Sequence, residues 1–490
     1  MPVIPFAPWR PDVAELNAAY TGDVLNVLCA DGSYIPFPQL QDFTAALPDD
    51  ALGAFVARSL AGSVVIFAGT EEKLYRLDNT DLGWDDVSQA TVTYGATPTA
   101  PWSFAQFGDY VVAVNQNDDP QVFNLGSSTK FADLAGSPPR AGVVRAWGDF
   151  LVLMQLTSNL NRAQWSGLND IEEWTPGTAN SDYQDFPDGG VVQGSTQATN
   201  PIIFLERAIW LGTFIPGSVE IFSFQKIHEN RGARSANSIA TRGAFAFYAD
   251  EGGFFQISPS GEISSIGFEQ VDRTMFGSIS AAEVGRIAGA VDPFFSRVYW
   301  AVNQSAAEGL FDTIIVYDWT LQRWSQANAT IRFHFPASAP SMTLEGLDSI
   351  STSLDALPFS LDSKAYQSSA PVLAAFNEAN VMGMFSGAPM EALLTTSEAG
   401  DVQGGVTLVK SVTPIVDATD LADLSVAIGS RLRRSDSLTW TSEQVPSSNT
   451  GIVRKKSRGR FNRIRLRIAE DATWNHAQGV AVDAMPMGRR

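Results

Sequence analysis

Cysteine and histidine are scarce in this chain of 490 residues, which has one cysteine and three histidines. Cys29 cannot form an intramolecular disulfide, and we interpret it as a small buried hydrophobe. His228, His334 and His476 are far apart in the sequence and match no metal-ligand spacing, so we expect neither a metal nor another cofactor. The sequence also lacks the glycine-rich phosphate loop and the Gly-x-Ser-x-Gly motif of serine hydrolases.

Long apolar runs are missing as well. No stretch approaches the roughly 18 consecutive apolar residues that a membrane helix requires. The segment from Met1 to Trp9 has neither the cationic start nor the apolar stretch of a secretory signal. We therefore expect no membrane span, and synthesis in the cytoplasm.

Basic residues are few over most of the chain and concentrated near its end. Residues 1–430 carry 20 Lys and Arg against 48 Asp and Glu, a net charge of −28, whereas residues 431–467 carry 11 against two, a net charge of +9. An acidic body argues against ordinary nucleic-acid binding, because basic side chains supply most of that affinity by displacing counterions. It suits a surface past which a polyanion moves without adhering.

A short motif recurs at a spacing of 40 residues. Phe107-Gly-Asp-Tyr110 and Trp147-Gly-Asp-Phe150 each precede an apolar segment, a polar turn and a second short strand. Similar units begin near residues 64, 202, 244 and 297, and a degenerate unit spans residues 354–387. Four-stranded antiparallel sheets of about 40 to 50 residues are the blades of a β-propeller. We predict a mainly β protein with a propeller of six or seven blades, and a pair of β-sandwiches is the alternative.

The pattern divides the chain into three parts. Residues 1–48 contain seven prolines and are expected to form an N-terminal extended arm. Residues 49–390 are the predicted propeller, in which Trp165 and Trp324 should be buried between sheets. Residues 391–490 alternate over longer stretches and should form a separate C-terminal β-sandwich-like domain. Residues 341–370, rich in small residues, are either a channel loop or a surface linker.

The C-terminal part contains a strictly alternating segment, Arg463-Ile-Arg-Leu-Arg-Ile468. In a strand its three arginines share one face, with neighbours about 6.6 Å apart, and its three aliphatic residues share the other. An acidic protein surface, DNA phosphate or solvent are the environments that such a face fits. With the cations before it, the segment forms a candidate assembly interface that consists of Arg454, Lys455, Lys456, Arg458, Arg460, Arg463, Arg465 and Arg467.

Catalysis finds no support in the sequence. Glycoside hydrolysis needs a carboxylate pair, but pairs such as Asp182 with Asp185 or Asp250 with Glu251 cannot be distinguished from turn residues that cap their own backbone. The tryptophans fall mostly at strand positions, where packing between sheets accounts for them better than a carbohydrate groove. We therefore predict that the protein is not an enzyme and has no hydrolase activity.

A family resemblance extends over nearly the whole chain. The segments that carry it are Pro8-Trp-Arg-Pro-Asp12, Trp102-Ser-Phe-Ala-Gln-Phe-Gly-Asp-Tyr110, Gln164-Trp-Ser-Gly-Leu-Asn169, Ser181-Asp-Tyr-Gln-Asp-Phe-Pro-Asp-Gly189, Val271-Asp-Arg273, Ser360-Leu-Asp-Ser363, Arg458-Gly-Arg-Phe-Asn-Arg463 and Gly488-Arg-Arg490. In these segments the chain resembles the β-propeller tail proteins of short-tailed bacteriophages, variously called nozzle, tail tubular protein B or packaged-DNA stabilisation protein.

The resemblance implies a structural protein of the virion tail. Proteins of that family form a homo-oligomeric ring of six copies below the adaptor that joins head and tail. Their channel retains packaged double-stranded viral DNA and passes it into the host during infection, without reading its sequence. Tail fibres or spikes are further partners in the family, but this chain has a short N-terminal arm and no long insert to anchor them. The alternative function is a glycan-binding or glycan-hydrolysing propeller on the virion.

Overall fold

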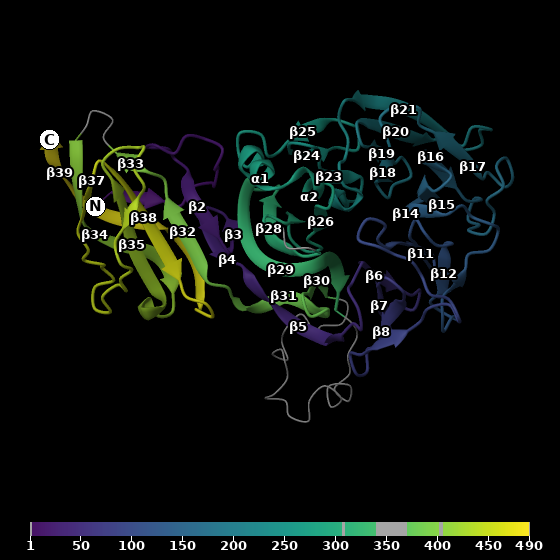
Figure 1. The fold of residues 1–490 in the computed structure, drawn as a ribbon, viewed down its shortest axis with the longest axis horizontal. Coiled ribbons are helices and arrows are strands. Elements are labelled where there is room, and N and C mark those ends of the chain that lie inside the picture. Colours follow the sequence, from purple (N-terminus) through teal and green to yellow (C-terminus); the bar gives the residue numbers. More distant parts are fainter. Residues whose placement is uncertain (1, 306–308, 340–369, 401–404, 490) are drawn as a thin grey trace.

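The computed structural model describes residues 2–305, 309–339, 370–400 and 405–489. They form two β-rich bodies, a ring of sheets and a two-sheet sandwich, which lie side by side (Figure 1). Within these residues the helices are α1 (Asp272–Ser278), α2 (Ala281–Val284) and two 3-10 turns (Ala236–Ser238 and Leu421–Asp423). None of them is long and apolar enough to cross a membrane.

Five sheets of the ring share one construction, in which four antiparallel strands follow one another in chain order. The recurring motif of the sequence is the hairpin turn between the first two strands. Gly108 (φ 57°) and Gly148 (φ 59°) take the left-handed backbone that such two-residue turns require, which residues other than glycine adopt at a cost.

The strands of these five sheets are β6 (Gly53–Arg58), β7 (Val64–Gly69), β8 (Leu74–Leu77) and β9 (Trp84–Asp86); β10 (Ser103–Phe107), β11 (Tyr110–Val114), β12 (Gln121–Asn124) and β13 (Ala132–Asp133); β14 (Ala141–Trp147), β15 (Phe150–Leu156), β16 (Asn159–Trp165) and β17 (Asp182–Asp185); β18 (Val192–Ser195), β19 (Ile202–Leu205), β20 (Ala208–Phe214) and β21 (Phe222–Glu229); and β22 (Ala240–Arg242), β23 (Phe245–Ala249), β24 (Phe254–Ile257) and β25 (Ile263–Ser265).

The sixth sheet of the ring has seven strands, and its long strand β29 is strongly curved (Figure 1). The first part of β29 pairs with β28 and the last part with β30. The prediction of six or seven blades therefore depends on whether this sheet is counted as one blade or two. Its strands, in spatial order, are β26 (Ala288–Val291), β27 (Arg297–Val302), β28 (Phe311–Asp318), β29 (Arg323–Ser338), β30 (Pro371–Asn377), β31 (Val381–Pro389) and β5 (Pro38–Ala46).

Apolar clusters between neighbouring sheets hold the ring together. Between the first two sheets, the rings of Phe67 and Phe123 meet edge to face with centroids 5.2 Å apart. Trp84 of the first sheet and Phe376 of the seven-stranded sheet belong to one cluster, with ring centroids 5.8 Å apart, so the ring closes on itself. The predicted β-propeller is thus confirmed. Trp165 (3% exposed) and Trp324 (0%) are buried as expected.

The second body is the predicted β-sandwich, but it draws strands from both ends of the chain. One sheet consists of β3 (Val27–Ala30), β4 (Ser33–Pro36), β39 (Trp474–Arg489), β34 (Gly405–Ala418) and β37 (Ser457–Gly459), with β1 (Val3–Pro5) also paired to β39. The other consists of β2 (Thr21–Leu25), β32 (Ala392–Thr396), β38 (Phe461–Ile468), β35 (Leu424–Arg431) and β36 (Thr439–Trp440), with β33 (Ala399–Gly400) also paired to β38.

The N-terminal segment is therefore not the extended arm that its prolines suggested for residues 1–48. Strands β1 to β4 are built into the sandwich, and β5 is the last strand of the seven-stranded propeller sheet. The prolines fit this arrangement because Pro5, Pro36 and Pro38 lie at strand ends, where a missing backbone N–H is tolerated. The segment 341–370, apart from Ala370, lies outside the described residues.

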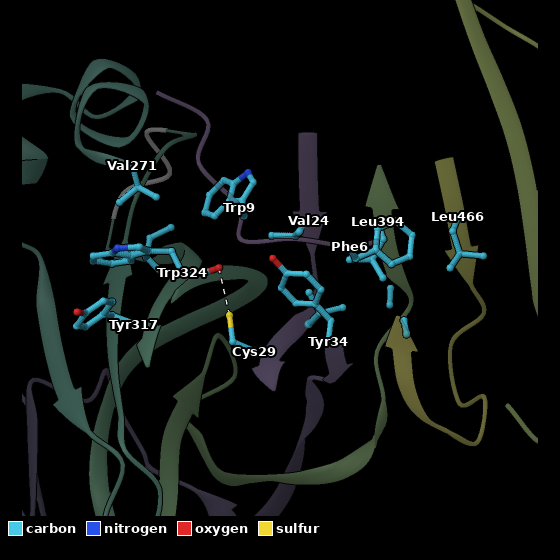
Figure 2. Packing of buried hydrophobic residues seen from close by; sticks show 14 of the residues in the cluster. Phe6, Trp9, Val24, Cys29, Tyr34, Val271, Tyr317, Trp324, Leu394 and Leu466 are labelled. Atoms are coloured by element: carbon cyan, nitrogen blue, oxygen red, sulfur yellow. Dashed lines mark hydrogen bonds between the residues drawn. The ribbon is translucent and has the colours of Figure 1, made fainter. Parts of the chain in front are cut away.

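One apolar core runs from the sandwich into the propeller (Figure 2). Leu394 and Leu466 belong to its sandwich side and Trp324 to its propeller side, and N-terminal residues such as Tyr34 lie between them. The thiol of Cys29, buried as expected, donates a hydrogen bond to the carbonyl of Trp324 (3.3 Å). The two bodies are therefore joined by interior packing rather than by a flexible linker.

Asn26 fixes the backbone at this junction. Its N–H donates to the carbonyl of Gln326 (2.8 Å), and its side-chain oxygen accepts from the N–H of Asn328 (2.8 Å). Its amide nitrogen donates to the carbonyl of Glu391 (2.8 Å), where the chain passes from the propeller to the sandwich. Asn26 has a left-handed φ of 56°, which asparagine tolerates better than most residues.

Asp272 is a buried acid at the same junction. It is the first residue of α1, is 8% exposed and accepts a hydrogen bond from the N–H of Phe254 (3.1 Å). Asp12, from the N-terminal segment, accepts hydrogen bonds from the N–H groups of Arg273 and Thr274 at the start of α1 (both 2.8 Å). Burial, with a smaller contribution from the charge of Asp12, raises the pKa of Asp272 to about 7.

This elevated pKa predicts a pH dependence of stability. Between about pH 4 and pH 7 the folded protein retains on Asp272 a proton that the unfolded chain releases, so raising the pH through this range lowers the free energy of unfolding. We expect Asp272→Asn to remove this slope and to be more stable than the native protein at pH 8 by up to about 4 kcal/mol. Urea denaturation at pH 5 and pH 8 measures it. The exposed control Asp149→Asn should leave the slope unchanged, and an unchanged slope in Asp272→Asn would contradict the prediction.

Candidate functional site

The alternating segment predicted from the sequence is strand β38. Ile464, Leu466 and Ile468 are buried in the core of the sandwich, so the predicted division of faces is confirmed for them. The arginines alternate with them on the opposite face, and each is partly buried.

Each of the three arginines has a partner within the chain. Arg463 forms an ion pair with Glu15 of the N-terminal segment. Arg467 forms ion pairs with Glu391 and with Glu443, the latter at 3.0 Å.

Arg465 places its guanidinium carbon 3.9 Å from the ring centroid of Trp440, in cation–π geometry. Its positive charge also acts on Asp23 of β2, by lowering a pKa that desolvation raises. Arg463, Arg465 and Arg467 are thus held by interactions within the sandwich. They are not an unpaired part of the candidate assembly interface.

The free cations lie immediately before that strand. Arg454, Lys456 and Arg458 are exposed, and none of their side chains has a hydrogen-bonded or ion-paired partner in the described part of the chain. Ser457 and Gly459 are buried, so alternate residues point outward. We call Arg454, Lys456 and Arg458 the cationic row. Arg454 and Lys456 precede β37, and Arg458 lies within it. Strand β37 is an edge strand of its sheet.

The two remaining predicted residues are less available. The ammonium group of Lys455 donates a hydrogen bond to the hydroxyl of Ser442 (2.7 Å). The Nε of Arg460 is buried. Of the eight residues that the sequence proposed, the structure therefore leaves three with exposed and unpaired side chains among the residues it describes.

A buried ion pair that the sequence analysis missed lies at the end of β35. The carboxylate of Glu398, which has no exposed surface, accepts hydrogen bonds from Nε and Nη2 of Arg431 (2.6 and 2.7 Å). These bonds raise the pKa of Arg431. The carbonyl of Arg431 also accepts a hydrogen bond from the N–H of Arg460, which connects the end of β35 to the segment that carries the cationic row. Glu398 and Arg431 are 33 residues apart, and no local pattern signals their pairing.

Three of the four candidate catalytic acids make structural contacts. Asp185 accepts two hydrogen bonds from Arg162 (2.6 and 2.8 Å), which lower the pKa of its carboxyl group. Asp182 and Asp250 each accept a hydrogen bond from the N–H of the following residue. These are the local backbone contacts that the sequence analysis expected of turn residues.

The histidines are also separated in space into different contacts. His228 lies 2.6 Å from the carbonyl of Gly261, and His476 lies 3.0 Å from the hydroxyl of Ser33. Burial lowers the pKa of His334 to about 4. In the described ranges, no group of three or more His, Cys, Asp or Glu side chains is placed to hold a metal ion.

Comparison with known proteins adds the fold but no family. No protein-family model and no curated protein matches the chain. Among solved structures it is similar to YCF48 bound to a D1 peptide, with 11% identity and a TM-score of 0.38 over 71% of this chain and 97% of that one. It is also similar to BamB from Moraxella catarrhalis, with 11% identity and a TM-score of 0.39 over 74% and 94%. Likeness at this level concerns the β-propeller fold alone.

The two sets of cations should respond differently to charge reversal. Changing Arg463, Arg465 and Arg467 to Glu places negative charge against Glu15, Glu391 and Glu443, so we expect the sandwich to lose about 2 kcal/mol or more of stability. Changing Arg454, Lys456 and Arg458 to Glu breaks no described contact and should alter stability by less than about 1 kcal/mol. Urea denaturation of both triple variants checks this, and equal losses would contradict it.

Proposed function

We propose that this protein is a structural component of the short tail of a bacteriophage, in which several copies form a ring that continues the DNA channel. The proposal includes no catalysis. Its support is the resemblance of eight segments to phage tail proteins, together with a propeller and a sandwich that share one apolar core. The partners are further copies of this chain, the adaptor between head and tail, and viral double-stranded DNA.

The observation that carries the assembly part of the proposal is the cationic row on an acidic protein. The chain has a net charge of −20, yet Arg454, Lys456 and Arg458 point outward from one edge of the sandwich without partners among the described residues. Opposite charges on different surfaces of identical copies favour head-to-tail contacts, which close into a ring when the rotation between copies allows it. We propose that the row contacts an acidic surface of the neighbouring copy or of the adaptor.

The acidic charge of the remaining surface fits passage of DNA. A surface of the same sign as the phosphate backbone repels it, so that DNA slides through the ring without adhering. The number of copies is six in the proposal because the resembling family forms rings of six.

We expect reversal of the cationic row to prevent assembly without unfolding the subunit. The Arg454→Glu, Lys456→Glu, Arg458→Glu variant should remain monomeric where the native protein forms rings, because like charges would then meet at the contact. Light scattering after gel filtration and negative-stain electron microscopy measure the ring population. A matched control reverses Lys130, Arg207 and Arg433, three other exposed cations whose side chains have no ion-paired partner among the described residues, which changes the net charge equally.

The control separates a specific contact from a general effect of charge. Rings that disappear in both variants would indicate that net charge alone governs assembly, and intact rings in the first variant would exclude the row from the interface. A native protein that stays monomeric at every concentration and retains host polysaccharide would favour the glycan-binding alternative.

A further inference from the structure

A cavity of about 440 Å³ lies at the centre of the propeller. Strands from around the ring line it, because β10, β14, β18, β26 and β29 all contribute residues, as do the segments that lead into β6 and β22. Its size is within the range of small-molecule sites in proteins. This position on the axis brings together side chains that are more than 200 residues apart in the sequence.

Two of the arginines in this cavity are neutralised by acids. Arg332 donates to the carboxylate of Asp50 at 2.7 Å, and Arg286 donates to Glu283 at 3.1 Å. Asp50, itself at the cavity wall, also accepts from the amide of Asn380 (3.1 Å). The acidic groups described around the cavity are thus already engaged.

Arg145 is different, because no acidic side chain of the described residues pairs with it. Its Nη1 donates to the hydroxyl of Ser103 (3.1 Å) and to the carbonyl of Val144 (2.8 Å). Its Nε and Nη2 groups have no acceptor in the part of the chain that the structure describes, and they are not among its fully buried polar atoms. These donors therefore face the cavity. Desolvation lowers the pKa of Arg145 to about 10, which reflects a charge with no neutralising partner.

Three glutamine side chains line the cavity with Arg145, namely Gln116, Gln155 and Gln193. Gln155 lies at a β-bulge between β15 and β16 and has a left-handed φ of 55°, which is strained for a residue other than glycine or asparagine. Its side-chain oxygen lies 2.5 Å from the position that a Cβ atom would take at Gly142, so a larger residue there would force the amide to shift. The bulge thus directs this amide into the cavity, beside the strand that carries Arg145.

We propose that the axial cavity binds a small molecule with a carboxylate or phosphate group, which pairs with the guanidinium of Arg145 and accepts hydrogen bonds from the glutamine amides. Two free N–H directions of one guanidinium match the two oxygens of such a group. The amide groups supply neutral donors that add specificity without further charge. This inference is independent of the proposed role in the tail, because it concerns the inside of a single propeller rather than the contact between copies.

The test uses sodium phosphate and sodium succinate as probes, with sodium chloride at equal ionic strength as the reference. We expect at least one probe to bind saturably to the full-length protein in isothermal titration calorimetry and to raise its melting temperature. Arg145→Met should weaken that binding at least about tenfold, since it removes the charge-assisted hydrogen bonds. Binding of phosphate alone, or of succinate alone, identifies which oxyanion the site takes.

Two further variants keep the test decisive. Arg145→Lys retains the positive charge but cannot form the bidentate hydrogen bonds of a guanidinium, and it should fold. Its affinity for the probe should lie between that of the native protein and that of Arg145→Met. Arg140→Met removes an exposed arginine that pairs with Asp119 and should bind like the native protein. The proposal would be overturned if no probe bound saturably to the native protein. It would also be overturned if Arg145→Met and Arg145→Lys both bound the probe as tightly as the native protein does.

Discussion

The apolar core shared by the propeller and the sandwich is the interaction on which the rest of this structure depends. It is assembled around residues from the N-terminal segment, such as Phe6, Trp9 and Tyr34, which lie between the two bodies. Asn26 adds hydrogen bonds to both the propeller and the segment that leaves it. Because the same segment then continues into β5, it contributes strands to the sandwich and to the closing sheet of the ring. Neither body is complete without it.

The propeller and the sandwich differ in the strand edges that they leave exposed. A propeller leaves only short strands such as β9 and β13 as edges, and closing its ring buries sheet faces, here where the seven-stranded sheet packs against the first sheet through the cluster that contains Trp84 and Phe376. The sandwich retains edge strands such as β37, which carries exposed Arg458 in its centre. Charged residues on an edge strand discourage indiscriminate pairing with other chains. An edge of this kind admits an ordered contact only with a partner of complementary charge.

Local signals in the sequence were sufficient for the elements whose partners are close in the chain. The apolar segment, polar turn and second strand after Tyr110 and after Phe150 predicted the pairs β11–β12 and β15–β16 correctly, because the paired segments are close in the chain. The alternation from Arg463 to Ile468 likewise predicted which side of the strand is buried.

The sequence could not reveal pairings between distant segments. Val3 pairs with Ala481 and Val24 with Leu394, and nothing in a proline-rich segment indicates such partners. The same limit applies to the candidate site. Glu15 neutralises Arg463 from the other end of the chain, so a count of charges along the sequence overestimated how many arginines are free. The axial cavity is composed in the same way, from single residues of strands spread around the ring.

The pairing of the first strands with the last has a consequence for biosynthesis. Strands β1, β2 and β4 leave the ribosome first, but their partners β32 and β39 are made last, after the whole propeller has been translated. At about 5 to 20 residues per second, the early strands wait roughly 20 seconds to a minute and a half before their sheets can form. The propeller sheets that are complete in chain order can fold during translation, whereas the sandwich and the ring-closing strand depend on that delay. A nascent chain of this protein therefore exposes unpaired strands for much of its synthesis, which makes it a natural client for ribosome-associated chaperones.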